Sequence, residues 1–110
     1  MENIKIVTIA QERLDFSTVV EFEQQMMKYF RESHKAIIVN MKNVDYADSR
    51  AIGLFVGLKM QCKNKGILFG LCCMHPDVRY IFKVTSVDTA IDVFDCEDEA
   101  LNHFETILNE

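Results

Sequence analysis

The sequence is poor in the residues that loops and flexible linkers use. Its 110 residues include a single proline and four glycines, and the chain also has no tryptophan. This composition excludes a low-complexity or disordered chain, and the 49% of hydrophobic residues is enough for a folded core. No apolar run approaches the roughly 18 residues of a membrane span. The N-terminus has no basic segment and only a short apolar run, which is unlike a signal peptide, so we expect a cytoplasmic protein without membrane insertion.

Positive charge is also scarce. The chain carries 12 Lys and Arg against 17 Asp and Glu, for a net charge of −5. Non-specific nucleic-acid binding needs a basic surface, so we expect no direct nucleic-acid partner. The four cysteines, Cys62, Cys72, Cys73 and Cys96, contain no C-x-x-C pair, which argues against a zinc site or a disulfide framework. We expect all four to be buried, reduced thiols that pack as small apolar residues.

The sequence also lacks the common catalytic motifs. It has no glycine-rich phosphate-binding loop, no H-E-x-x-H and no G-x-S-x-G. We interpret His34, His75 and His103 as surface histidines at helix ends or on a polar face. Asp45 and Asp48 can in principle form a carboxylate pair or a metal site, although such residues in a loop more often serve turns and caps. We therefore expect a binding protein, not an enzyme, without catalytic residues, metal or cofactor.

Apolar periodicity predicts strands and helices in alternation. Strands are expected at residues 4–10, 36–41, 67–72 and 91–94, and helices at 19–32, 49–64, from 75 onward, and after Asp95. Asp15 or Ser17 is expected to cap the first helix, and Asp95 the last. This order indicates a single α/β domain over residues 1–110, with a mixed, mostly parallel sheet of about four strands and about four helices. In such sheets, functional loops lie at the carboxyl ends of the strands.

The stretch from Val44 to Gly53 follows the second predicted strand and opens an apolar helix. Asp48 and Ser49 are both good N-cap residues, and the exposed N–H groups of a helix start can bind an anion, receive a phosphate or dock a partner. The simpler interpretation is that these residues only cap the helix. Residues 51–58 are nearly all apolar, with Gly53 and Gly57 on one side, where a sheet or a neighbouring chain can approach closely. Such a helix is buried on more than one side or presents an apolar patch to a partner.

The order and spacing of several motifs resemble the STAS domain of bacterial anti-sigma factor antagonists. The family pattern is an apolar strand, a polar turn, Asp-Ser-Ser/Thr-Gly-Leu-Gly at a helix start, a closing Gly before the next strand, and an acidic cap before Ala-Leu. The matching segments here are residues 37–41, 44–47, Asp48-Ser49-Arg50-Ala51-Ile52-Gly53, Gly66 before residues 67–69, and Asp95 before Ala100-Leu101. Leu14-Asp15 also matches Gly-x-Leu-Asp of the family, with Glu12 in place of Gly. We expect the first N-terminal strand of many members to be missing here.

The resemblance implies a protein-binding switch. In the family, the unphosphorylated domain binds an anti-sigma factor that is also a serine kinase, phosphorylation of the second hydroxyl residue breaks the complex, and a phosphatase restores it. Here Arg50 occupies that acceptor position and Ala51 replaces the next Gly. Arginine cannot accept a phosphoryl group and keeps a permanent positive charge. Ser49 matches the preceding position, one residue early for the acceptor.

Three interpretations follow from the resemblance. The domain binds its partner without a phospho-switch at this position, or Ser49 serves as a displaced acceptor, or the domain belongs to a transport or lipid-trafficking complex. The partner contact is expected in the loop and helix start at residues 44–57. The expected partner-binding residues are Asp15, Asp45, Asp48, Ser49, Arg50, Ala51 and Phe55. The apolar helix and an exposed edge at the first strand also allow a homodimer.

Overall fold

The strands and helices alternate along the chain as the apolar pattern predicts. The computed structural model describes residues 3–110. Its main sheet has the strand order β1-β3-β5-β6 and is made of β1 (Ile4–Thr8), β3 (Ala36–Asn40), β5 (Leu68–Cys72) and β6 (Asp92–Phe94). Every neighbouring pair in this sheet is parallel. The predicted α/β fold with a mostly parallel sheet is therefore confirmed, and β1 and β6 form its two edges.

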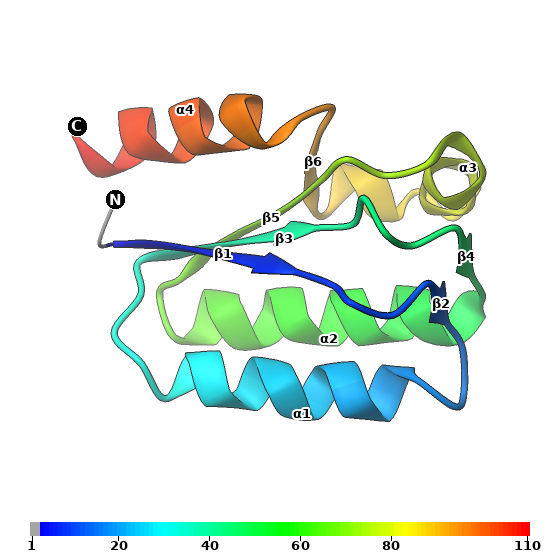
Figure 1. Cartoon of the computed structure of the whole chain (residues 1–110). Helices are drawn as coiled ribbons and strands as arrows, with labels where there is room; N and C mark the ends of the chain where they lie inside the picture. The colour runs from blue at the N-terminus through cyan, green and yellow to red at the C-terminus, as the bar shows by residue number, and fades with distance from the viewer. Residues whose placement is uncertain (1–2) are drawn as a thin grey trace.

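Helices cover both faces of this sheet. The helical elements are α1 (Val19–Phe30), α2 (Ser49–Asn64), α3 (Pro76–Val84), the 3₁₀ turn η1 (Val87–Thr89) and α4 (Glu97–Leu108). Figure 1 shows α1 and α2 side by side on one face and α4 on the opposite face. The inner strand β3 is buried along its whole length for this reason. Ile37 and Val39 join the core on the α1–α2 side, whereas Ala36 and Ile38 pack with α4.

The α4 side of the sheet depends on one close approach. Gly70, in the middle of β5, faces the aromatic rings of Phe104 and Phe94. A Cβ atom at this position would lie 2.9 Å from the ring of Phe104 and 3.0 Å from that of Phe94. Glycine is therefore required for α4 to pack this closely on the sheet. In contrast, a Cβ at Gly53 or Gly57 would meet nothing within 4 Å, so the close approach expected at these two glycines does not occur within the described chain.

A second, very small sheet was not predicted from the sequence. The two-residue strands β2 (Arg13–Leu14) and β4 (Tyr46–Ala47) pair in parallel beyond the carboxyl ends of β1 and β3 (Figure 1). Two further backbone hydrogen bonds extend the contact, from the N–H of Asp45 to the carbonyl of Glu12 at 2.8 Å and from the N–H of Asp48 to that of Leu14 at 3.2 Å. The segment before α1 is thereby fixed alongside the segment before α2.

The start of α4 differs from the prediction. The N-cap position is Cys96, not Asp95, and Cys96 makes no side-chain capping hydrogen bond. The carboxylate of Asp95 instead accepts a hydrogen bond from the guanidinium of Arg79 in α3 at 2.9 Å. This ion pair links α3 to the loop before α4.

The cysteines divide into two groups. Cys62 and Cys72 are buried, as expected, whereas Cys73 is half-buried and Cys96 is exposed. Burial raises the pKa of the Cys62 thiol to about 11, and it raises that of Cys72 still further. The expectation of four buried thiols is therefore wrong for Cys73 and Cys96.

Candidate functional site

The start of α2 is capped as its sequence predicts. Asp48 has extended backbone geometry, and its Oδ1 accepts a hydrogen bond from the backbone N–H of Arg50 at 2.9 Å. Its Oδ2 lies 3.7 Å from the guanidinium of Arg50. Ser49 is the first residue of the helix and is exposed. Asp48 therefore acts both as the helix cap and as the counter-charge of Arg50, which leaves the hydroxyl of Ser49 on the surface.

Two of the expected partner-binding residues do not reach the surface. Ala51 and Phe55 are both fully buried. The ring of Phe55 lies between two other aromatic rings of the core, with centroids 6.1 Å from Phe22 and 5.7 Å from Phe82. The prediction of a partner contact by the side chains of Ala51 and Phe55 is corrected accordingly, because helix α2 turns these side chains toward the sheet.

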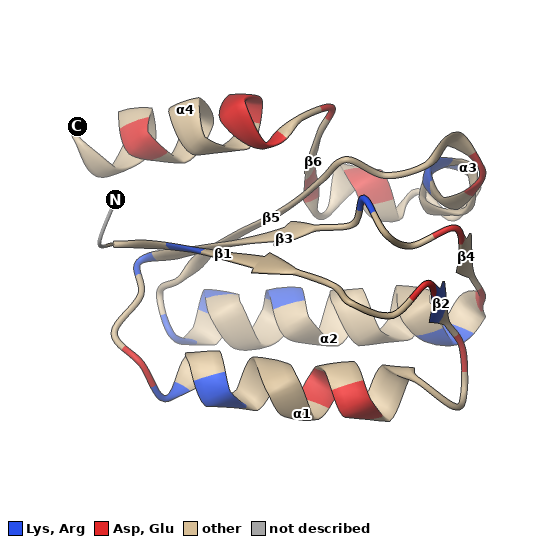
Figure 2. Ribbon diagram, in the orientation of Figure 1, with Lys and Arg blue, Asp and Glu red and all other residues tan. Residues whose placement is uncertain are grey.

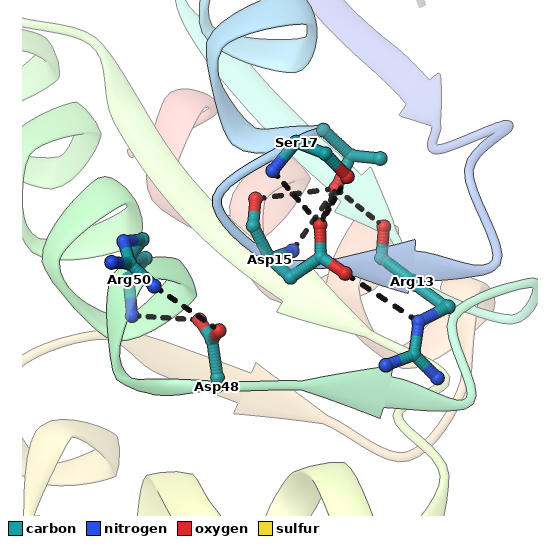
Figure 3. A network of polar contacts seen from close by, with 6 residues as sticks. Arg13, Asp15, Ser17, Asp48 and Arg50 are labelled. Carbon is teal, nitrogen blue, oxygen red and sulfur yellow. Dashed lines mark hydrogen bonds and ion pairs between the residues drawn. The ribbon is translucent and has the colours of Figure 1, made fainter.

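Asp15 organises the turn that leads into α1. Its Oδ1 accepts hydrogen bonds from the backbone N–H and the hydroxyl of Ser17, at 3.0 and 2.6 Å. Its Oδ2 lies 3.5 Å from Nε of Arg13 (Figure 3). The hydrogen bonds from Ser17 first, and then the contact with Arg13, hold the pKa of Asp15 below its usual value. Thr18, not Asp15 or Ser17, occupies the N-cap position of α1, so the predicted cap is wrong while the carboxylate keeps a role in the turn.

The small β2–β4 sheet brings this turn to the start of α2. Figure 3 shows the group of Arg13, Asp15 and Ser17 next to the pair of Asp48 and Arg50. Between them, the guanidinium of Arg50 lies over the ring of Phe16, with 5.5 Å from Cζ to the ring centroid. A cation over an aromatic face is attractive, so Phe16 and Asp48 together hold Arg50 on the surface.

Phe16 is a functional candidate that sequence reasoning missed. Phe16 is 70% exposed, and Val20, the second residue of α1, is 55% exposed. A shallow groove of about 230 Å³ runs beside Val20 between α1 and α2, with Glu23 on the α1 side and Arg50 and Gly53 on the α2 side. Because Gly53 has no side chain, the groove stays open at that point. The signal in the sequence was an aromatic residue directly after the Leu14-Asp15 motif.

Asp45 lies in different surroundings from Asp48. It lines a separate cleft with Tyr46 of β4 and with Asp77 and Tyr80 of α3. Asp48 instead caps α2 and contacts Arg50. Within residues 3–110, no group of three or more His, Cys, Asp and Glu side chains is arranged to hold a metal ion.

The sequence comparisons identify the family. The family model of the STAS domain matches residues 1–100. The anti-sigma-B factor antagonist of Staphylococcus aureus is 36% identical over 101 residues, an alignment that covers 83% of this chain and 93% of that protein. The chain therefore belongs to the STAS domain family, and it resembles the anti-sigma factor antagonists within it. The relative's name describes a regulator, which agrees with a regulatory protein–protein role.

Solved structures confirm the fold. An anti-sigma factor antagonist from Mycobacterium paratuberculosis superposes with a TM-score of 0.84 at 17% identity, covering 94% of this chain and 86% of that one. A sulfate transporter family protein from Wolinella succinogenes gives the same TM-score of 0.84, also at 17% identity, over 98% of this chain and 89% of that one. The fold is thus shared by regulators and by transporter-associated proteins. In the part of the chain that the structure describes, no helix is both long and apolar enough to cross a membrane.

Proposed function

We propose that this chain is an anti-sigma factor antagonist that binds its anti-sigma factor through the surface around the start of α2. This surface, called the docking face below, consists of Asp15, Phe16, Val20, Asp48, Ser49 and Arg50. The observation that carries the proposal is the position of Arg50 on Phe16. Phenylalanine and arginine are both enriched at protein interfaces, and arginine is among the side chains that most often dominate their binding energy.

The docking face is built to bind without a phosphate at the family's acceptor position. A phosphoserine or phosphothreonine there would add about −1.5 to −2 charges. Arg50 places a permanent positive charge at the same position, and Asp48 and Phe16 fix its direction. The charge at this point of the docking face is therefore constant, and we propose that binding is not switched off by modification of residue 50.

The direct test is binding to an anti-sigma-B factor, such as the one antagonised by the Staphylococcus aureus relative, measured by calorimetry. We expect Arg50→Asp to weaken binding at least about tenfold, because reversing a charge within an interface opposes the complementary charge of the partner. Arg50→Lys should lose less binding affinity than Arg50→Asp, because it keeps the positive charge. Arg31→Asp is the matched control, since Arg31 is an exposed arginine at the far end of α1. Equal affinity of Arg50→Asp and the parent protein would place the interface elsewhere.

A second candidate keeps the switch and moves its acceptor by one residue. The observation that favours it is that Ser49 is exposed at the start of α2. A phosphate there would lie at the positive end of the helix dipole and beside Arg50, both of which stabilise it. Incubation with a serine-kinase anti-sigma factor and ATP, followed by peptide mass spectrometry, tests this. Phosphate on Ser49 that Ser49→Ala removes would support a displaced acceptor, whereas an unmodified Ser49 in a protein that still binds would refute it.

The third interpretation, a subunit of a transport or lipid-trafficking complex, is separated by purification. The tagged protein is isolated from its native host, and the co-purifying proteins are identified. A kinase-like anti-sigma factor supports the antagonist. Co-purification of a membrane-transport ATPase without such a factor would contradict the proposal that the chain is an antagonist.

A further inference from the structure

A second cleft lies on the other side of β4, against α3. It has a volume of about 340 Å³, which is at the small end of the range for ligand sites, about 300–1,000 Å³. Its walls are Asp45 and Tyr46 from the β4 segment and Asp77 and Tyr80 from α3, over apolar residues of α3. A space of this size has room for one long side chain of a partner protein.

The charge within this cleft is of one sign. Asp45 and Asp77 are the two charged residues that line it, and both are exposed. The ion pairs found within residues 3–110 join Arg13 to Asp15, His34 to Glu32, Arg50 to Asp48 and Arg79 to Asp95. In this described part of the chain, the carboxylates of Asp45 and Asp77 therefore form no ion pair, so the cleft can accept a further positive charge.

The tyrosines give a second, independent indication. Tyr29 carries the ammonium groups of Lys5 and Lys28 over its ring, at 5.0 and 5.4 Å from the centroid. Tyr46 carries the guanidinium of Arg13 at 4.0 Å. Tyr80 has no such contact with residues 3–110, and its side chain is 65% exposed. Tyr80 thus presents an exposed aromatic ring at the edge of a cleft that is lined by two carboxylates without an ion-pair partner in the described residues.

We propose that this cleft binds an arginine side chain of the protein partner. The guanidinium group is planar, stacks on aromatic rings and forms paired hydrogen bonds with carboxylates, so it fits a tyrosine face beside two aspartates better than an ammonium group does. The cleft and the docking face are adjacent along the chain, because Tyr46 of β4 lines the cleft and Asp48 of the docking face follows it by two residues. One partner can therefore contact both, and the identity of that partner as an anti-sigma factor rests on the proposed function.

The cleft can be tested without the protein partner. The probe is the peptide acetyl-Gly-Arg-Gly-amide, titrated into ¹⁵N-labelled protein and followed by amide chemical shifts. The control peptide carries citrulline in place of arginine, because citrulline has nearly the same shape as arginine but no charge. We expect saturable shifts concentrated at residues 45–47 and 77–81, with at least fivefold weaker binding of the citrulline peptide.

Variants distinguish the cleft from general attraction to an acidic protein. Asp45→Asn combined with Asp77→Asn should abolish the saturable shifts, and Tyr80→Ala should weaken them. Asp92→Asn combined with Asp98→Asn is the matched control, because both residues are exposed aspartates away from the cleft. Equal binding of the two peptides, shifts spread over other acidic segments, or no saturable shift would each overturn the proposal. All variants are checked for an unchanged fold by their amide spectra.

A second measurement connects the cleft to the partner. Asp45→Lys combined with Asp77→Lys should weaken binding of the anti-sigma-B factor about tenfold if its arginine occupies the cleft, and unchanged affinity would refute the partner contact. If the anti-sigma-B factor does not bind the parent protein at all, the proposed function fails, while the peptide titration still decides on the cleft.

Discussion

Replacing Phe55 or Phe16 by alanine makes the same chemical change at two positions with opposite burial. Phe55 is fully buried between the rings of Phe22 and Phe82, whereas Phe16 is 70% exposed. Truncating a buried phenylalanine costs about 3–5 kcal/mol, out of a total of about 5–15 kcal/mol for a domain. With a slope near 2 kcal/mol per molar urea, Phe55→Ala should lower the unfolding midpoint by about 1.5–2.5 M. Phe16→Ala should change the free energy of unfolding by no more than about 0.5 kcal/mol.

Binding should respond in the opposite order. If the proposed function is right, Phe16→Ala removes an exposed aromatic contact and the ring that supports Arg50. This change should weaken binding of the anti-sigma factor about 5- to 30-fold, or about 1–2 kcal/mol. Phe55→Leu, a milder core variant that leaves more of the stability intact, should bind normally at a temperature where it is folded. Urea unfolding followed by circular dichroism and calorimetric titration measure the two effects. The assignment of the interface to Phe16 would be refuted if the folded Phe55→Leu variant failed to bind while the Phe16→Ala variant bound with full affinity. That result would indicate that Phe55 itself takes part in binding.

Three further predictions concern single positions. Gly70→Ala should lower the free energy of unfolding by about 1–3 kcal/mol, because the new Cβ would lie 2.9 Å from the ring of Phe104, and an unchanged thermal midpoint would show that α4 moves freely. Asp48→Ala should lower the free energy of unfolding by about 0.5–2 kcal/mol, because the helix cap is lost. Urea unfolding compares this variant with Asp48→Asn, whose side chain can still cap the helix. Burial raises the pKa of Cys62 to about 11, so at pH 8 this thiol stays protonated and unreactive. Mass spectrometry after brief iodoacetamide treatment should therefore show alkylation at exposed Cys96 before Cys62, and the reverse order would contradict the packing.

Much of the fold was predictable because its signals are local. The predicted bounds of α2, residues 49–64, are those found, since Asp48 caps the start and Lys65-Gly66 ends the helix. β3 was recognised as a strand buried on both faces from its unbroken apolar run. The β2–β4 sheet was not predicted, because two-residue strands have no periodicity and pair only through the tertiary structure.

The candidate site was predicted in part for the same reason. The positions of Asp15, Asp48, Ser49 and Arg50 followed from short motifs. Phe55 was wrongly expected at the interface because residues 51–58 are apolar on almost every side, and only the position of the sheet decides which side is buried. Phe16 was missed because a single aromatic residue in a loop has no periodicity to show whether it is buried or exposed.

The two proposed contacts together restrict how a partner can lie on this chain. Arg50 presents a fixed positive charge on one side of β4, and the cleft with Asp45 and Asp77 presents two free negative charges on the other. A partner that satisfies both must place an acidic group opposite Arg50 and an arginine opposite the cleft, which fixes its orientation across β4. If relatives carry a phosphorylatable hydroxyl at this position, as the family pattern implies, their partners meet a neutral group or a phosphate of about −1.5 to −2 charges where this chain holds +1. Discrimination between this chain and such relatives would then arise at residue 50, and the cleft would supply affinity that does not depend on it.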